Sequence, residues 1–441
     1  MHDNLEHRWD ISTMTVKGKV VKAAMEEEIR SLIGMGTWEL VERPPGVNIM
    51  KNQWGYTQVY GADYDKTYAP ALNYVLVGAS WKKNQVDTSF YFKVGDDKVA
   101  CWVLVYVDDM LAASSSTEML KELKELLEAA FELREISPVQ KYLGLEIVHD
   151  RSVGKLWLHQ QGYADKLRRW FLDEEQTGRT PKTPASVNAY AEITFNNEEA
   201  QELQEEEYQQ KVSSLQLAVT TTRPDIAFTY SKLGSGLMVR SDQHWREIDH
   251  CLTYLANTRD TALEFGSGPG SLKLVGYVVA DDAGDKQNRT STGGYMFVYG
   301  GAAFSWSSQR IKCATLSTTE SEYAAATEAN KEGHRLHFLL AEFRQLDVGT
   351  PTLLRVDNNS AIMVAEGMGL MGKLKHMERR QAWLLHMVKR GNFSLKYIPT
   401  AEQLADFLTK ALHYPAFNRC SVAIGQVRLA DASDDDDDVQ L

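Results

Sequence analysis

The order of the elements expected after residue 272 is the feature that most constrains the fold. Three apolar, β-branched runs predict three strands, and a long helix follows them before strands and helices alternate. The expected strands are 272–279, 294–299, 302–307, 352–356 and 393–398, and the expected helices are 318–346, 360–366, 378–389 and 401–411. This order predicts a self-contained α/β domain of about 140 residues, which is a typical domain size.

The acidity of the chain is local. The net charge is −12, but residues 192–207 contain seven Glu and no Lys or Arg, and residues 431–438 contain six Asp. We expect both segments to be solvated and mobile. The remainder is close to neutral and has local basic clusters at Arg379-Arg380 and around Arg310 and Lys312. Because phosphate contacts need only local positive charge, the overall acidity does not exclude a nucleic-acid ligand.

No stretch of the sequence approaches the roughly 18 apolar residues that a membrane helix needs. The first ten residues are polar and lack the apolar centre of a signal peptide. We therefore expect an intracellular protein, cytoplasmic or nuclear. The cysteines lie too far apart in sequence to form a zinc or CxxC motif: Cys101, Cys251, Cys313 and Cys420.

The stretch WVLVYVDDM, residues 102–110, is an apolar run that ends in two adjacent carboxylates, Asp108 and Asp109. One interpretation is a hairpin corner, because Asp side chains often bond to the backbone of turns. The other is a metal site, since Mg²⁺ prefers oxygen ligands and needs few carboxylates when substrate phosphates complete its shell. These residues alone do not decide between the two interpretations.

In the second half, several carboxylates lie where helices begin or strands end. Taken singly, each has an ordinary structural explanation, such as a favourable helix dipole or a turn. Taken together, they match the several carboxylates that a two-metal phosphodiesterase site requires. The residues are Asp281, Asp282, Glu320, Glu322, Asp357 and Asp406.

The second half resembles the ribonuclease H domain of copia-type retrotransposon polyproteins. The matching stretches are LVGYVVADDAGDKQNRTSTGGYMFVYGG, FSWSSQRIKCATLSTTESEYAAATEA, LLRVDNNSAI, KLKHMERR and IPTAEQLADFLTKAL. TTRPDIAFTYSKLGSG and HWREIDHCLTYLANT resemble the family's connection region. The first half resembles the reverse transcriptase of these elements, through MEEEIRSLIGMGTWELVERPPG, GYTQVYGADYDKTYAP, VLVYVDDML and KYLGLEIVHD.

The resemblance implies an α/β (α+β) chain with a partial polymerase followed by a ribonuclease H-like domain. That domain would hold a five-stranded mixed sheet flanked by helices, and the polymerase part would pack poorly before residue 99. The expected divisions are a truncated reverse transcriptase with partial fingers, palm and thumb at 1–175, a linker and connection region at 176–270, the ribonuclease H-like domain at 271–415, and a C-terminal segment with the acidic tail at 416–441.

The resemblance also implies site residues and ligands. Asp108 and Asp109 would be two of three polymerase carboxylates that bind Mg²⁺ beside a primer end. Glu322, Asp357 and Asp406 would bind Mg²⁺ or Mn²⁺ in the ribonuclease H centre. The partners would be an RNA–DNA hybrid, or an RNA template with a DNA primer.

Two departures bear on activity. The family's first polymerase Asp lies in a D-V-x-x-A-F-L stretch, which is missing here, and Asp87 lies in DTSFYFK, which fits a later segment better. In the ribonuclease H pattern G-Y-S-D-A-D, Val279 stands at the first metal ligand. Asp281, two residues further, points to the same strand face about 6–7 Å along and is the candidate replacement.

His376, in KLKHM, matches a family histidine that assists product release, and the alternative is a surface histidine beside Lys375. Three functions therefore stay open: a copia-type reverse transcriptase and ribonuclease H segment, a catalytically dead remnant, and a non-enzymatic nucleic-acid-binding module. We expect polymerase activity to be lost.

Overall fold

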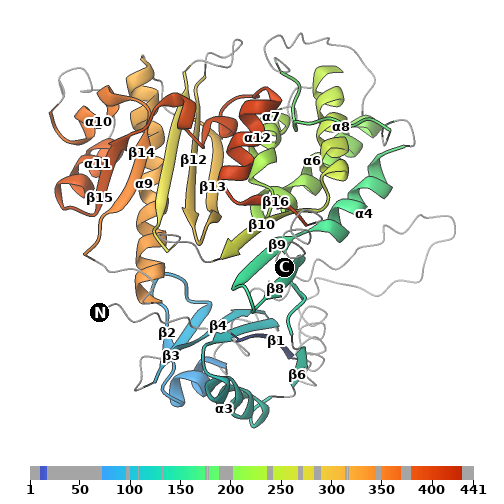
Figure 1. The fold of residues 1–441 in the computed structure, drawn as a ribbon, viewed down its shortest axis with the longest axis vertical. Coiled ribbons are helices and arrows are strands. Elements are labelled where there is room, and N and C mark those ends of the chain that lie inside the picture. Colours follow the sequence, from blue (N-terminus) through green and yellow to red (C-terminus); the bar gives the residue numbers. More distant parts are fainter. Residues whose placement is uncertain are drawn as a thin grey trace, which may run out of the picture. The chain divides into compact units, whose positions relative to one another are not determined.

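The computed structural model divides the chain into two compact units, Met1–Tyr142 and Leu143–Leu441. Figure 1 shows the elements of each unit. The structure describes residues 10–16, 72–95, 100–107, 109–131, 133–136, 138–173, 176, 178–187, 202–235, 242–266, 272–282, 290–312, 315, 317–343, 349–368 and 379–429. The two candidate site residues Asp108 and His376, most of the first acidic segment and the acidic tail lie outside these ranges.

The first unit contains an antiparallel sheet with the strand order β2-β3-β4-β5-β1-β6. Its elements are β1 (Asp10–Val16), β2 (Lys82–Lys83), β3 (Phe90–Val94), β4 (Ala100–Tyr106), β5 (Asp109–Ser114), α3 (Thr117–Glu128) and β6 (Leu133–Ile136), and β7 (Lys141–Tyr142) ends the unit. The helix α3 is amphipathic and buries Leu120, Leu123 and Leu127. Val103 and Met110, from β4 and β5, belong to the same apolar cluster.

Residues 72–95 pack better than the sequence led us to expect, while residues 1–9 and 17–71, which the same expectation covered, lie outside the described ranges. Leu72 and Leu76 are almost fully buried, and Trp81 and Tyr91 are nearly so. These four side chains join the cluster under α3. The described part of the first unit therefore has a continuous core.

The second unit contains the predicted five-stranded mixed sheet, with the order β13-β12-β11-β14-β15. Its strands are β11 (Val275–Asp281), β12 (Thr292–Tyr299), β13 (Ala302–Arg310), β14 (Thr352–Val356) and β15 (Phe393–Tyr397). β11 pairs antiparallel with β12 and parallel with β14, and β14 pairs parallel with β15. The helices of this part are α9 (Thr318–Glu342), α10 (Asn359–Ala365) and α11 (Arg379–Lys389).

Successive side chains of β11 point to opposite faces of the sheet, so neighbouring residues belong to two different apolar clusters. Val278 joins the cluster that includes residues of α9, α10 and α11. Val279 joins a second cluster, built largely from the helices that precede the sheet in sequence. The sheet is therefore covered on both faces, as predicted.

Those preceding helices belong to the second unit together with a smaller sheet. They are α4 (Gln161–Phe171), α6 (Glu202–Thr221), η1 (Pro224–Ile226), α7 (Ala227–Ser235) and α8 (Asp242–Asn257). The smaller sheet pairs β8 (Leu145–Asp150), β9 (Lys155–His159), β10 (Thr261–Gly266) and β16 (Gln426–Arg428). Residues 145–159 thus share a sheet with segments more than 100 residues later in the chain.

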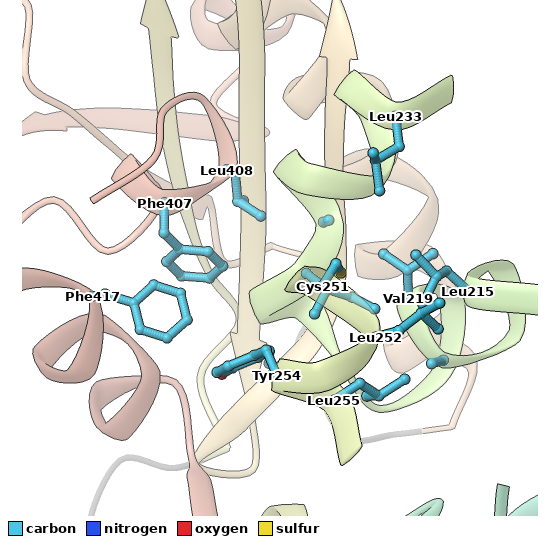
Figure 2. Packing of buried hydrophobic residues seen from close by; sticks show 14 of the residues in the cluster. Leu215, Val219, Leu233, Cys251, Leu252, Tyr254, Leu255, Phe407, Leu408 and Phe417 are labelled. Carbon is cyan, nitrogen blue, oxygen red and sulfur yellow. The ribbon is translucent and has the colours of Figure 1, made fainter. Parts of the chain in front are cut away.

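Figure 2 shows the second cluster, in which side chains from α6, α7 and α8 meet those of the last part of the chain. Tyr254 packs edge-on against Phe417, and Phe417 packs edge-on against Phe407. Aromatic contacts with α8 therefore help to hold Phe407 and Phe417 in place.

The helix predicted over 401–411 is wrong. The chain there forms two short turns, η3 (Thr400–Glu402) and η4 (Asp406–Leu408), and the helix α12 (Tyr414–Ala423) follows. Gln403 interrupts helical geometry, with φ −69° and ψ 110°. Its fully buried side chain donates from Nε2 to the Val278 carbonyl at 2.9 Å, a bond that holds this segment against β11.

Candidate active site

The carboxylate of Glu322 lies in the second turn of α9. Ser317 caps this helix by accepting a hydrogen bond from the Glu320 amide. Glu322 is only 6% exposed, and its Oε1 accepts a 2.9 Å bond from the Ala280 amide of β11. Burial, together with the charges of Asp357 and Asp406, raises the pKa of Glu322 to about 8, and the bond from the Ala280 amide acts in the opposite direction.

Asp357 follows directly after β14, at the strand end where it was predicted. Its Oδ2 accepts a 3.1 Å bond from the Thr400 hydroxyl, and its Oδ1 is buried without a hydrogen-bond partner among the described atoms. Because Asp357 raises the pKa of both Glu322 and Asp406, its charge lies close to both.

Asp406 begins the short turn η4 and is 8% exposed. Burial raises its pKa, Lys410 opposes this rise, and Asp357 adds to it. The Lys410 ammonium lies 3.1 Å from Asp406 Oδ1. The structure therefore places Glu322, Asp357 and Asp406 near enough for their charges to interact.

Asp281 is the last residue of β11 and Asp282 follows it, and the two lie in different surroundings. Asp282 Oδ1 accepts bonds from the Ser321 and Ser291 hydroxyls, at 2.7 and 3.1 Å, so it anchors the strand to α9. Burial raises the pKa of Asp281, and Lys410 is the strongest opposing charge. Asp281 therefore lies near enough to Lys410 for the two charges to interact.

Val279, which the resemblance places at the family's first ligand position, is 3% exposed. It packs in the cluster that contains Phe407 and Leu408, the two residues after Asp406. Val279 was identified from the sequence, whereas the contacts of Gln403 and Lys410 near these carboxylates were not expected. Lys410 carries one sequence signal, its spacing of four from Asp406, whereas Gln403 carries none.

The donor chemistry of the site suits a hard cation, but its geometry is incomplete. Glu322 Oε2 and Asp357 Oδ1 are buried oxygens without a hydrogen-bond partner among the described atoms. Oxygen atoms of this kind are the ligands that Mg²⁺ prefers. Within the described residues, however, no three His, Cys, Asp or Glu side chains come close enough together to hold a metal ion. The residues present therefore do not form a complete metal centre.

The YVDD stretch is a hairpin between β4 and β5. Tyr106 pairs with Asp109 across this hairpin, and Asp109 also pairs with Thr15 of β1. Val107 has φ +54°, a left-handed conformation that is unusual for a β-branched residue. Asp87 lies in the turn between β2 and β3, where its Oδ1 accepts a bond from the Ser89 amide.

Comparison with known proteins gives the class of the chain. Residues 5–184 match the family model described as reverse transcriptase (RNA-dependent DNA polymerase). The chain is 30% identical over 424 residues to the retrovirus-related Pol polyprotein from transposon TNT 1-94 of Nicotiana tabacum, covering 94% of this chain and 31% of the relative. It is 28% identical over 432 residues to the retrovirus-related Pol polyprotein from transposon RE2 of Arabidopsis thaliana, covering 96% of this chain and 28% of the relative.

Solved structures are also similar to about a third of the chain. LC11-RNase H1, solved in complex with an RNA/DNA hybrid, is 19% identical with a TM-score of 0.24, covering 31% of this chain and 94% of that one. RNase H1 from Halobacterium salinarum is 22% identical with a TM-score of 0.22, and the match covers 31% of this chain and 94% of that one.

The family match identifies a reverse transcriptase domain in the first part of the chain. Over most of its length the chain is homologous to the Pol polyproteins of copia-type retrotransposons. It spans about three tenths of the length of the curated relatives it matches. No helix among the described residues is long and apolar enough to span a membrane.

Proposed function

We propose that the ribonuclease H-like domain, residues 271–415, binds RNA–DNA hybrids at its carboxylate edge, and that Val279 prevents their hydrolysis. One observation carries the proposal: an apolar side chain, 3% exposed, occupies the position of a metal ligand beside three coupled carboxylates. The family assignment supplies the substrate class, since ribonuclease H domains act on such hybrids.

The loss of one ligand explains the loss of hydrolysis. Two-metal hydrolysis needs several carboxylate oxygens to hold ions about 3.5–4 Å apart, and Val279 supplies none. The pKa of Glu322, about 8, also means that this side chain is largely protonated at neutral pH without a cation beside it. A protonated carboxyl is a poor ligand, so the site binds divalent cations weakly.

The polymerase part carries no proposal of activity. The first catalytic Asp motif is missing from the sequence, and Asp87 belongs to a turn that it stabilises itself. A template-primer extension assay with the full chain in Mg²⁺ is expected to give no product.

The test is cleavage of a labelled RNA–DNA hybrid by the full chain, in Mg²⁺ and in Mn²⁺, with binding measured in parallel. We expect the natural chain to bind the hybrid in a salt-dependent way without cleaving it. Val279→Asp is expected to introduce cleavage, and adding Asp357→Asn to that variant is expected to abolish it.

Other outcomes would assign a different function. Cleavage by the natural chain that Asp357→Asn removes would mean that Asp281 replaces the missing ligand and that the protein is a working ribonuclease H. Neither binding nor cleavage in any variant would identify a catalytically dead remnant.

A further inference from the structure

We propose that α4 and α6 form a binding site for an unpaired base of a single-stranded nucleic acid. A hollow of about 660 Å³ lies between these helices at the surface of the second unit. It is lined by Tyr163, Trp170, Phe171, Gln210, Ser213 and Ser214. The inference rests on the proposed function for its ligand class, but it uses none of the residues of the carboxylate site.

Trp170 provides the surface on which a base can stack. It is 57% exposed, whereas every other tryptophan that the structure describes is buried or half-buried. The Lys166 ammonium lies 4.5 Å from the centre of its ring, and Phe171 lies edge-on to it at 6.2 Å. An exposed indole with a cation beside it suits a base and its phosphate, because bases of any sequence stack on aromatic rings.

A hydrogen bond between α4 and α6 fixes the two helices that border the hollow, and polar side chains line its α6 side. The Tyr163 hydroxyl donates a 2.7 Å bond to the Ser214 carbonyl, which ties α4 to α6. Gln210 and Ser213 are both exposed and lie three residues apart, so they share one face of α6. An amide and a hydroxyl can each donate and accept, which suits the mixed donors and acceptors on the edge of a base.

The charge around the hollow favours a phosphate backbone over an apolar peptide. Lys166, Arg168 and Arg169 are exposed on α4, and none of them forms an ion pair with a carboxylate within the described part of the chain. Arg169 donates from Nε only to the Asp165 carbonyl, at 3.2 Å. Three available cations within four residues form a local basic surface on an acidic chain.

Four described carboxylates lie near this surface: Asp165 and Asp173 on the α4 side, and Glu206 and Glu207 on α6, where Glu207 pairs with Lys211. Asp165 is compensated by Arg259, whose Nε lies 3.5 Å from its Oδ1. Glu206 is exposed on α6, one helical turn before Gln210. The balance stays positive on the α4 side, where the exposed indole lies.

The experiment measures binding of a fluorescently labelled strand of about 12 nucleotides to the full chain, by anisotropy at low and moderate salt. Oligo-uridine and oligo-deoxythymidine arms distinguish RNA from DNA. The variants are Trp170→Ala and Trp170→Tyr. The matched control is Tyr414→Ala, because Tyr414 is also exposed beneath a cation, with Lys182 5.1 Å from its ring, but does not line the hollow.

We expect Trp170→Ala to weaken binding about tenfold, Trp170→Tyr to retain most of it, and Tyr414→Ala to leave it unchanged. Equal binding by Trp170→Ala and the natural chain would overturn the inference, and so would equal losses in the two alanine variants. Preference for an apolar peptide over either strand would assign the hollow to a protein partner instead. Binding of the single strand without binding of the hybrid would overturn the proposed function and leave this inference intact.

Discussion

The Ala280 amide donates a 2.9 Å hydrogen bond to Glu322 Oε1, and this bond joins the central strand β11 to the long helix α9. It satisfies one oxygen of the carboxyl group and leaves Oε2 buried without a partner among the described atoms. The fold therefore holds Glu322 in place, but only one hydrogen bond among the described atoms compensates the charge of its carboxylate.

The first prediction concerns pH. Burial raises the pKa of Glu322 from 4.5 to about 8, so between these values the folded chain keeps a proton that the unfolded chain releases. The contribution of Glu322 to stability is therefore fully present below pH 4.5 and is lost as the pH rises through about 8. Glu322→Gln cannot ionise, and it should melt close to the natural chain at pH 5 and higher at pH 8.

The measurement is a melting-temperature series from pH 5 to pH 8.5 in EDTA. Glu328→Gln is the control, because Glu328 lies on the same helix but is exposed and paired with Lys331. A constant difference between Glu322→Gln and the natural chain across the series would contradict the prediction.

The second prediction concerns the buried ion pair that holds η1, α8 and β16 together. Arg223 Nη2 lies 2.7 Å from Asp225 Oδ2, which also accepts from the Tyr254 hydroxyl at 2.7 Å. Gln426 donates to Asp225 Oδ1 at 2.9 Å. Asp225→Ala would leave Arg223 buried and unpaired, so it should lower the free energy of unfolding by about 3–5 kcal/mol.

Urea unfolding followed by circular dichroism measures this loss. Tyr254→Phe removes one hydrogen bond from the same network and should cost about 1–3 kcal/mol. A greater loss for Tyr254→Phe than for Asp225→Ala would show that the ion pair contributes little.

The strands of the second half were predictable because their residues alternate or run apolar over lengths typical of strands. The strand 352–356 and the placement of Asp357 at its end follow from this pattern and are found. The helix expected over 401–411 failed because Gln403 makes a tertiary bond to Val278, which no local pattern encodes. The short β16 was missed for the same reason, since its three residues are a strand only through pairing with β10.

The places of the candidate site residues in the fold were predictable from the sequence, but their surroundings were not. Asp357 and Glu322 could be named from their motifs, whereas the burial that shifts the pKa of Glu322 depends on packing between distant segments. The burial of Val279 against Phe407 likewise depends on the irregular segment that the sequence suggested was a helix.

The third prediction concerns the turn of the YVDD hairpin. Val107 has φ +54°, which costs a β-branched residue about 1–3 kcal/mol and costs glycine little. Val107→Gly should therefore stabilise the chain by about 0.5–1 kcal/mol, after the loss of side-chain contacts and the greater freedom of the unfolded chain are included. Val105→Gly, in the regular strand β4, should destabilise it, and thermal unfolding would compare the two.

The final prediction concerns Val279 and metal binding, read out by stability rather than by cleavage. Val279→Asp would place a carboxylate in an apolar cluster beside Asp406, so in EDTA it should lower the free energy of unfolding by several kcal/mol. A bound cation would compensate that charge, so Mg²⁺ should raise the melting temperature of this variant far more than that of the natural chain.

Val278→Asp is the matched control for this measurement. Val278 is the neighbouring residue of the same strand, is fully buried, and faces the cluster that includes α9, α10 and α11. It should destabilise the chain at least as much and gain nothing from Mg²⁺, because its side chain points away from Asp406. Equal recovery of both variants in Mg²⁺ would mean that the cation binds without the residue at position 279, and the assignment of Val279 as the missing ligand would then be wrong.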